Sequence, residues 1–114
     1  MKLLDTDAVI DQLRRREHEP GWISVITLIE VLRGIPEGKR RRAKELIDES
    51  YDTLSLDNEA ILTYCALYQE LRERGQVVPD ADLLIAATAM SRGIPLETGD
   101  AHFQRLKEHG LEIA

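Results

Sequence analysis

The sequence has one cysteine, few aromatic residues and no long hydrophobic run. Because Cys65 has no partner in the chain, an internal disulfide is impossible, and we expect a reducing cytoplasmic location. Cys65 falls in a helical pattern and is expected to be a buried structural thiol. No apolar stretch approaches the roughly 20 residues of a transmembrane helix. The start, Met1–Asp5, turns acidic too soon for a secretory signal.

The length and charge of the chain also limit which class of protein it can be. Its 114 residues suit a single domain over residues 1–114, and 43% hydrophobic with 32% charged residues is typical of a folded globular protein. The formal net charge of -6 argues against passive, charge-driven adhesion to nucleic acid. Basic residues are nevertheless grouped in Arg14–Arg16 and Lys39–Arg42. These groups are either solvated helix faces or contacts to phosphate or to a partner.

Short apolar segments alternate with segments of helical periodicity, and no hairpin signal separates them. Strands are predicted at residues 2–4, 22–26, 53–56, 95–98 and 111–113, and helices at 6–17, 27–33, 36–47, 57–75, 79–92 and 101–109. Residues 22–26 could instead lead directly into the helix near Thr27. This alternation favours an α/β fold, a three-layer α/β/α sandwich around a short parallel sheet.

Four acidic residues occupy positions that such a sheet would deliver to one edge. Asp5 and Asp100 each close a predicted strand, where the carboxyl ends of parallel strands meet. Glu30 and Asp82 have apolar neighbours on both sides, where a negative charge is costly unless something positive compensates it. We therefore expect these carboxylates to converge.

Converging carboxylates would repel one another, and a bound divalent cation is the simplest way to keep them ionised. Oxygen ligands suit a hard divalent cation, which can activate water and neutralise charge on a phosphate, so the residues predict a metal-dependent enzyme that acts on phosphate. We expect Asp5 and Asp100 to be direct ligands, with Asp82 and Glu30 acting directly or through water. Asp7 is either a charge at a helix N-terminus or a weak outer ligand.

Four segments of the chain resemble the PIN-domain family and, within it, the small VapC-type toxin ribonucleases. The match covers essentially the whole chain, and all four segments occur in order. They are Leu4–Asp7, Thr27–Gly34, Asp82–Ala89 and Thr98–Phe103.

The resemblance implies a PIN-like α/β/α sandwich and a Mg²⁺- or Mn²⁺-dependent endoribonuclease, the toxin of a toxin–antitoxin pair. It makes Asp5, Glu30, Asp82 and Asp100 the metal-binding and catalytic quartet, with Thr6 and Thr98 supporting them through hydroxyl hydrogen bonds. It also implies a structured RNA substrate, often transfer RNA, a homodimer, and a cognate antitoxin whose tail crosses the active-site groove. Many relatives carry an acidic residue where this chain has His102, and often an arginine in place of Gly99.

Each acidic residue also has a structural interpretation. Asp5 could cap the following helix, Asp100 could be a turn residue, and Glu30 could pair with Arg33. Asp80 follows a proline and is predicted to be the helix N-cap, leaving Asp82 for the site. His102 is expected to be a surface or packing residue, although its closeness to Asp100 makes it worth testing.

Two other functions fit parts of the sequence. Asp5-Thr6-Asp7 after an apolar strand resembles the nucleophile motif of haloacid-dehalogenase phosphatases, with Asp5 as nucleophile and Asp7 as acid/base. That interpretation leaves Glu30 without a role. The second alternative is a non-catalytic PIN-like binding module whose acidic pocket only docks a basic peptide.

Overall fold

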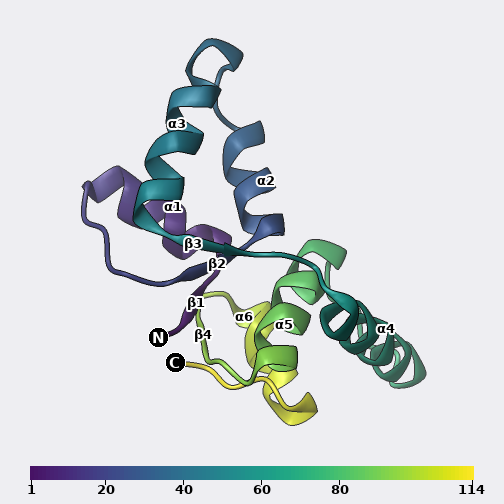
Figure 1. Ribbon diagram of the computed structural model, residues 1–114. Helices are drawn as coiled ribbons and strands as arrows, with labels where there is room; N and C mark the ends of the chain where they lie inside the picture. The colour runs from purple at the N-terminus through teal and green to yellow at the C-terminus, as the bar shows by residue number, and fades with distance from the viewer.

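The computed structural model describes all residues, 1–114, and its centre is a four-stranded parallel sheet in the order β3-β2-β1-β4. Helices α1, α2 and α3 lie on one side of the strands, and α4, α5 and α6 lie on the other (Figure 1). The predicted three-layer α/β/α architecture is confirmed. In chain order the elements are β1 (Leu3–Leu4), α1 (Thr6–Arg15), β2 (Trp22–Ser24), α2 (Val25–Arg33), α3 (Glu37–Ser50), β3 (Asp52–Leu54), α4 (Asn58–Glu73), α5 (Asp80–Arg92), β4 (Leu96–Glu97), α6 (Ala101–Gln104) and the 3₁₀ helix η1 (Arg105–His109).

The central strand β1 supplies one residue to each side of the sheet. Successive side chains of a strand point to opposite faces, so Leu3 and Leu4 enter different hydrophobic clusters. Leu3 packs with residues of α4, α5 and η1, whereas Leu4 packs with Val9 and with residues of α2 and α3. Both leucines are fully buried, so β1 connects the two cores and fixes the direction of the residue that follows.

Strand β2 and helix α2 follow one another without a loop. Ser24 ends the strand and caps the helix, because its hydroxyl accepts a hydrogen bond from the Ile26 N–H at 3.0 Å. The helix therefore begins at Val25, two residues before the predicted start. Gly21 allows β2 to lie close to β1, since a Cβ at this position would come within 2.4 Å of Leu4 Cδ1.

Helices α4 and α5 pack on the other face of the sheet. The side chain of Asp57 caps α4, and Gly93 ends α5 in the left-handed conformation, both as predicted. Asp80 is not the N-cap of α5: Pro79 occupies that position and makes no capping bond, while Asp80 accepts a hydrogen bond from the Tyr64 hydroxyl at 2.7 Å. No helix has the length and hydrophobicity needed to span a bilayer.

Three local predictions were wrong. Residues 101–109 form the short α6 followed by the 3₁₀ helix η1, instead of one continuous helix. Residues 111–113 do not form a full strand, because only Ile113 makes a parallel bridge to Leu96. Cys65 is exposed, because α4 turns Leu67 and Leu71 toward the core and Cys65 away from it.

Candidate functional site

A cavity of about 220 Å³ lies at the carboxyl ends of β1 and β4, where strand order changes direction. All four predicted carboxylates line it. Its lining consists of Asp5, Thr6, Asp7, Glu30, Asp82, Ile85, Asp100 and Phe103. Residues separated by nearly the whole chain therefore meet in one acidic pocket, with Ile85 and Phe103 as its apolar part.

Asp5 and Asp100 both stand between a strand and a helix. Asp5 caps α1 by accepting from the Ala8 N–H at 2.8 Å, and Asp100 caps α6 by accepting from the His102 N–H at 2.9 Å. The capping interpretation is thus correct for Asp5, and Asp100 also acts as a cap. Capping fixes each backbone and leaves further lone pairs on each carboxylate for another partner.

Thr98 connects these two residues. Its hydroxyl donates to Asp5 Oδ2 at 2.5 Å and accepts from the Asp100 N–H at 3.0 Å. The junction after β4 is thereby bound to the junction after β1. Both carboxylates are positioned by the backbone and by Thr98.

Glu30 reaches the pocket from the middle of α2. Its Oε1 accepts from the Thr6 hydroxyl at 2.6 Å, and the Thr6 hydroxyl lies 3.1 Å from Thr27 Oγ1. Arg33 lies on the same helix and places a guanidinium nitrogen 3.5 Å from Glu30 Oε2. The Arg33 pairing considered from the sequence does form. Arg33 is mostly exposed, however, so this pair is not a buried ion pair of the core.

Asp82 enters from the first turn of α5 and meets His102. The imidazole Nδ1 of His102 is 3.1 Å from Asp82 Oδ2 and 3.5 Å from Asp100 Oδ1. His102 therefore belongs to this cluster, although the sequence favoured a surface or packing role. The signal available in the sequence was its position two residues after Asp100, in a helix that starts at the pocket.

Burial and mutual repulsion make the pocket unfavourable for bare negative charge. Burial raises the pKa of the Asp5 carboxyl above its usual range, against opposing hydrogen bonds from Thr98 and the Ala8 N–H. Burial also raises the pKa of Asp82, which the hydrogen bond with His102 partly offsets. Asp100 adds repulsion in both cases.

The donor set suits a hard divalent cation. Asp5 has no cationic partner within salt-bridge distance, Asp82 and Asp100 have only His102, and Glu30 has only Arg33. Asp82, Asp100 and His102 each offer a ligand atom, and these atoms all lie within 4.8 Å of one another. Carboxylate oxygens that converge with so little compensating charge are the donors that Mg²⁺ and Mn²⁺ bind in proteins.

The remaining residues around the cavity were only partly foreseen. Asp7 lines the cavity, but it is exposed in the first turn of α1, which fits either of its two predicted roles. Thr27, one turn before Glu30, is completely buried and contacts Thr6, a role that sequence reasoning missed. Its spacing of three residues from Glu30 was the available signal.

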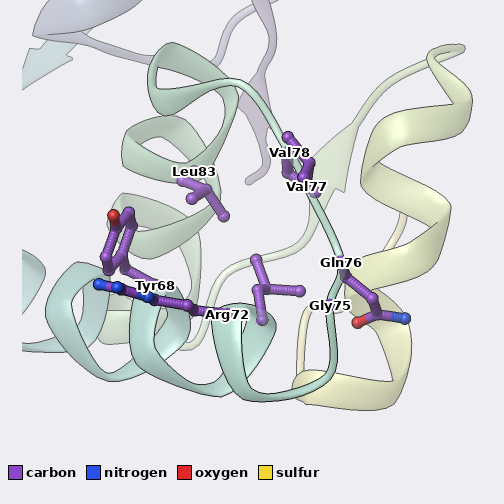
Figure 2. A pocket seen from close by; sticks show the side chains of 8 residues that line it. Tyr68, Arg72, Gly75, Gln76, Val77, Val78 and Leu83 are labelled. Atoms are coloured by element: carbon purple, nitrogen blue, oxygen red, sulfur yellow. The ribbon is translucent and has the colours of Figure 1, made fainter.

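A second hollow of about 310 Å³ lies beyond α5 and has a different character (Figure 2). It lies between the end of α4 and the segment 75–78, and its lining is mainly apolar, with Tyr68, Val78 and Leu83. No acidic residue lines it. Neighbouring residues of α5 thus line different hollows: Asp82 lines the acidic cavity and Leu83 lines the apolar hollow.

Comparison with known proteins agrees with this geometry. The family model of the PIN domain matches residues 2–109. The chain belongs to the PIN-domain family. Among curated relatives, ribonuclease VapC1 of Methanocaldococcus jannaschii is 39% identical over 115 residues, covering 97% of this chain and 85% of the relative.

Solved structures of VapBC toxin–antitoxin systems share the whole fold. VapBC-1 from nontypeable Haemophilus influenzae matches with a TM-score of 0.84 and 25% identity, over 99% of this chain and 96% of that one. DNA-bound VapBC from Salmonella typhimurium matches with a TM-score of 0.82 and 25% identity, over 100% and 98% of the two chains. The toxin–antitoxin structure VapBC-5 from Mycobacterium tuberculosis is 30% identical, with a TM-score of 0.74 and coverage of 99% and 94%.

Proposed function

We propose that this chain is a divalent-metal-dependent endoribonuclease and the toxin of a toxin–antitoxin pair. The observation that carries this proposal is the convergence of Asp5, Glu30, Asp82 and Asp100 on one cavity with little compensating positive charge. The named ribonuclease among its relatives supports RNA as the substrate class. One PIN-like domain over residues 1–114 carries the activity.

Asp5, Asp82, Asp100 and Glu30 hold Mg²⁺ or Mn²⁺ in this proposal. A bound cation would lower the pKa of a water molecule at the site and neutralise charge on the scissile phosphate. The residues of the chain position the donors: Thr98 holds Asp5 and Asp100 together, and Thr6 orients Glu30. Asp7 stands at the exposed rim, where it could act through water.

The phosphatase alternative fits this geometry less well. That alternative builds its chemistry on Asp5 and Asp7, but Asp7 is exposed in the first turn of α1 and forms no hydrogen bond with the other carboxylates of the cavity. Glu30 also has a defined place in the pocket, which a phosphatase built on Asp5 and Asp7 does not require. A measurement of RNA cleavage distinguishes the binding-module alternative, because a non-catalytic module would leave RNA intact.

Partners follow from the same proposal. The structures of toxin–antitoxin complexes among the neighbours support a cognate antitoxin that inhibits the nuclease. We place the protein in the cytoplasm, with structured RNA, and transfer RNA in particular, as substrate. A homodimer is supported by the exposed apolar side chains of Ile61 and Leu62 on α4, because adjoining exposed apolar side chains offer a surface that a second copy of the chain can cover.

The deciding experiment incubates purified protein with total RNA in the presence of Mg²⁺ or Mn²⁺ and sequences the new RNA ends. Internal cleavage at defined sites is expected for the wild type and is expected to disappear in Asp5→Asn purified in the same way. Wild-type preparations that leave RNA intact with either metal would overturn the proposal. Hydrolysis of p-nitrophenyl phosphate without RNA cleavage would favour the phosphatase instead.

A further inference from the structure

His102 is the one side chain of the acidic cluster that offers nitrogen instead of oxygen. Its Nδ1 lies 3.1 Å from Asp82 Oδ2 and 3.5 Å from Asp100 Oδ1, so the ring atom faces both carboxylates and not solvent alone. Neighbouring ligands of a six-coordinate ion with bonds near 2.1 Å lie about 3 Å apart. The two distances from Nδ1 are therefore close to those around a shared ion, and the three donor atoms all lie within 4.8 Å of one another.

The backbone around His102 holds the ring in this place. Its N–H donates to Asp100 Oδ1 at 2.9 Å, and the next residue, Phe103, is buried with 2% exposure. Asp82 approaches from α5, whose apolar residues are fixed in the core. Two helices thus position the three groups before any ion arrives: α6 carries His102 and begins at its cap Asp100, and α5 carries Asp82.

We propose that His102 is a nitrogen ligand of the divalent cation, together with Asp82 and Asp100, and that the site consequently prefers Mn²⁺ over Mg²⁺. This inference rests on the proposed metal-dependent function. Mg²⁺ favours oxygen donors and water, whereas an imidazole ligand favours transition metals. Two carboxylates and one imidazole should therefore favour Mn²⁺ over Mg²⁺ more strongly than three carboxylates would.

A role for His102 without metal contact makes a different prediction. An imidazole that only donates a hydrogen bond to Asp82 would orient that carboxylate for either cation. Its removal would then weaken Mg²⁺ and Mn²⁺ binding by similar factors. Selectivity and direct nitrogen contact therefore separate a ligand from a positioning residue.

The first test detects the nitrogen directly. Full-length protein is loaded with Mn²⁺ and studied by electron spin echo envelope modulation, with natural-abundance and ¹⁵N-histidine-labelled samples. A nitrogen coupling that changes with the label is expected in the wild type, lost in His102→Ala, and retained in His18→Ala. His18 is a suitable control because it is exposed and makes only an edge contact with Tyr51.

The second test measures selectivity by titrating each metal into the protein and following heat or free Mn²⁺. His102→Ala should lower Mn²⁺ affinity about tenfold and change Mg²⁺ affinity much less. His102→Asp should restore binding of both metals with a reduced Mn²⁺ preference. Circular dichroism shows whether each variant remains folded.

The two hypotheses fail in different ways. Bound Mn²⁺ without any histidine coupling, or an unchanged Mn²⁺-to-Mg²⁺ affinity ratio in His102→Asp, would overturn the role of His102 and leave the proposed nuclease intact. Absence of saturable Mn²⁺ and Mg²⁺ binding to the wild type would overturn both. A coupling that persists in His102→Ala would assign the nitrogen ligand to another residue.

Discussion

Thr98 donates a hydrogen bond to Asp5 Oδ2 across a sequence separation of 93 residues. The same hydroxyl oxygen accepts from the Asp100 N–H, so one threonine sets the relative position of two carboxylates that follow different strands. A group that orients metal-binding carboxylates contributes to affinity without touching the ion. The position of Thr98 therefore has direct consequences for activity.

Thr98→Val should lower metal affinity and RNA cleavage by about 10- to 100-fold, because valine keeps the shape and removes the hydroxyl. Thr98→Ser is the matched control, since it restores a hydroxyl at the same carbon. Metal titration and cleavage rates of the three proteins provide the comparison. A valine variant that matches the wild type in both would contradict a positioning role for Thr98.

Asp5→Asn and Asp100→Asn should abolish RNA cleavage while the protein stays folded. Each substitution removes a negative charge from the pocket but keeps an oxygen that can accept the capping hydrogen bond. Asp48→Asn is the control, because Asp48 pairs with Lys44 on the exposed side of α3. Cleavage rates and circular dichroism are measured together. Full activity in either site variant would remove that residue from the proposed mechanism.

The stability of the metal-free protein should depend on pH through Asp82. Because burial raises the pKa of Asp82 in the fold, its stabilising contribution is complete below the ordinary carboxyl pKa of 3.8 and is lost as pH rises through the raised value. Asp82→Asn should therefore gain stability relative to the wild type between mildly acidic and neutral pH. Urea unfolding in the presence of a chelator measures this difference. A difference that stays constant over that range would contradict the raised pKa.

Metal should stabilise the fold as well as support cleavage. A ligand that binds only the folded state at 100 times its dissociation constant adds about 2.7 kcal/mol to the free energy of unfolding. Thermal unfolding with Mn²⁺, with Mg²⁺ and with chelator should show this rise in the wild type and little of it in Asp100→Asn. An equal rise in both proteins would indicate binding elsewhere on the chain.

The proposed homodimer gives a prediction for α4. Leu62 is 63% exposed, and a charged residue at a buried apolar contact between subunits is strongly unfavourable. Leu62→Glu should therefore convert a dimer into a monomer, as measured by sedimentation equilibrium. Gln69→Glu, on the same helix, is the control for added charge alone. A Leu62→Glu protein that remains dimeric would place the interface on another surface.

The sequence was informative where a residue marks the end of an element. Asp5 and Asp100 follow apolar strands, and the carboxyl ends of parallel strands meet, so their proximity could be predicted. Glu30 was placed correctly although α2 starts two residues earlier than expected, because a small shift in the start of a helix does not move its later residues to another face. In these cases the order of strands and helices was enough to predict that the carboxylates lie close together.

The sequence was less informative where one pattern of apolar residues fits two orientations of a helix. Helix α4 carries two apolar stripes, and periodicity alone could not show that Leu67 and Leu71 face the core while Ile61 and Cys65 face outward. The site role of His102 depends on the contact of its ring with Asp82 on another helix, which periodicity within one segment does not reveal. Pairing of Ile113 with β4 likewise depends on backbone bonds at Leu96.

The shortness of β1 makes the centre of the molecule intolerant of insertions and deletions. Leu3 and Leu4 serve opposite cores, and Asp5 follows immediately. Losing a single residue here would exchange the two interiors and rotate the carboxylate out of the pocket in the same step. A substitution in this segment changes one contact at a time, whereas a change in its length would disrupt the packing of both cores and displace Asp5 from the cavity.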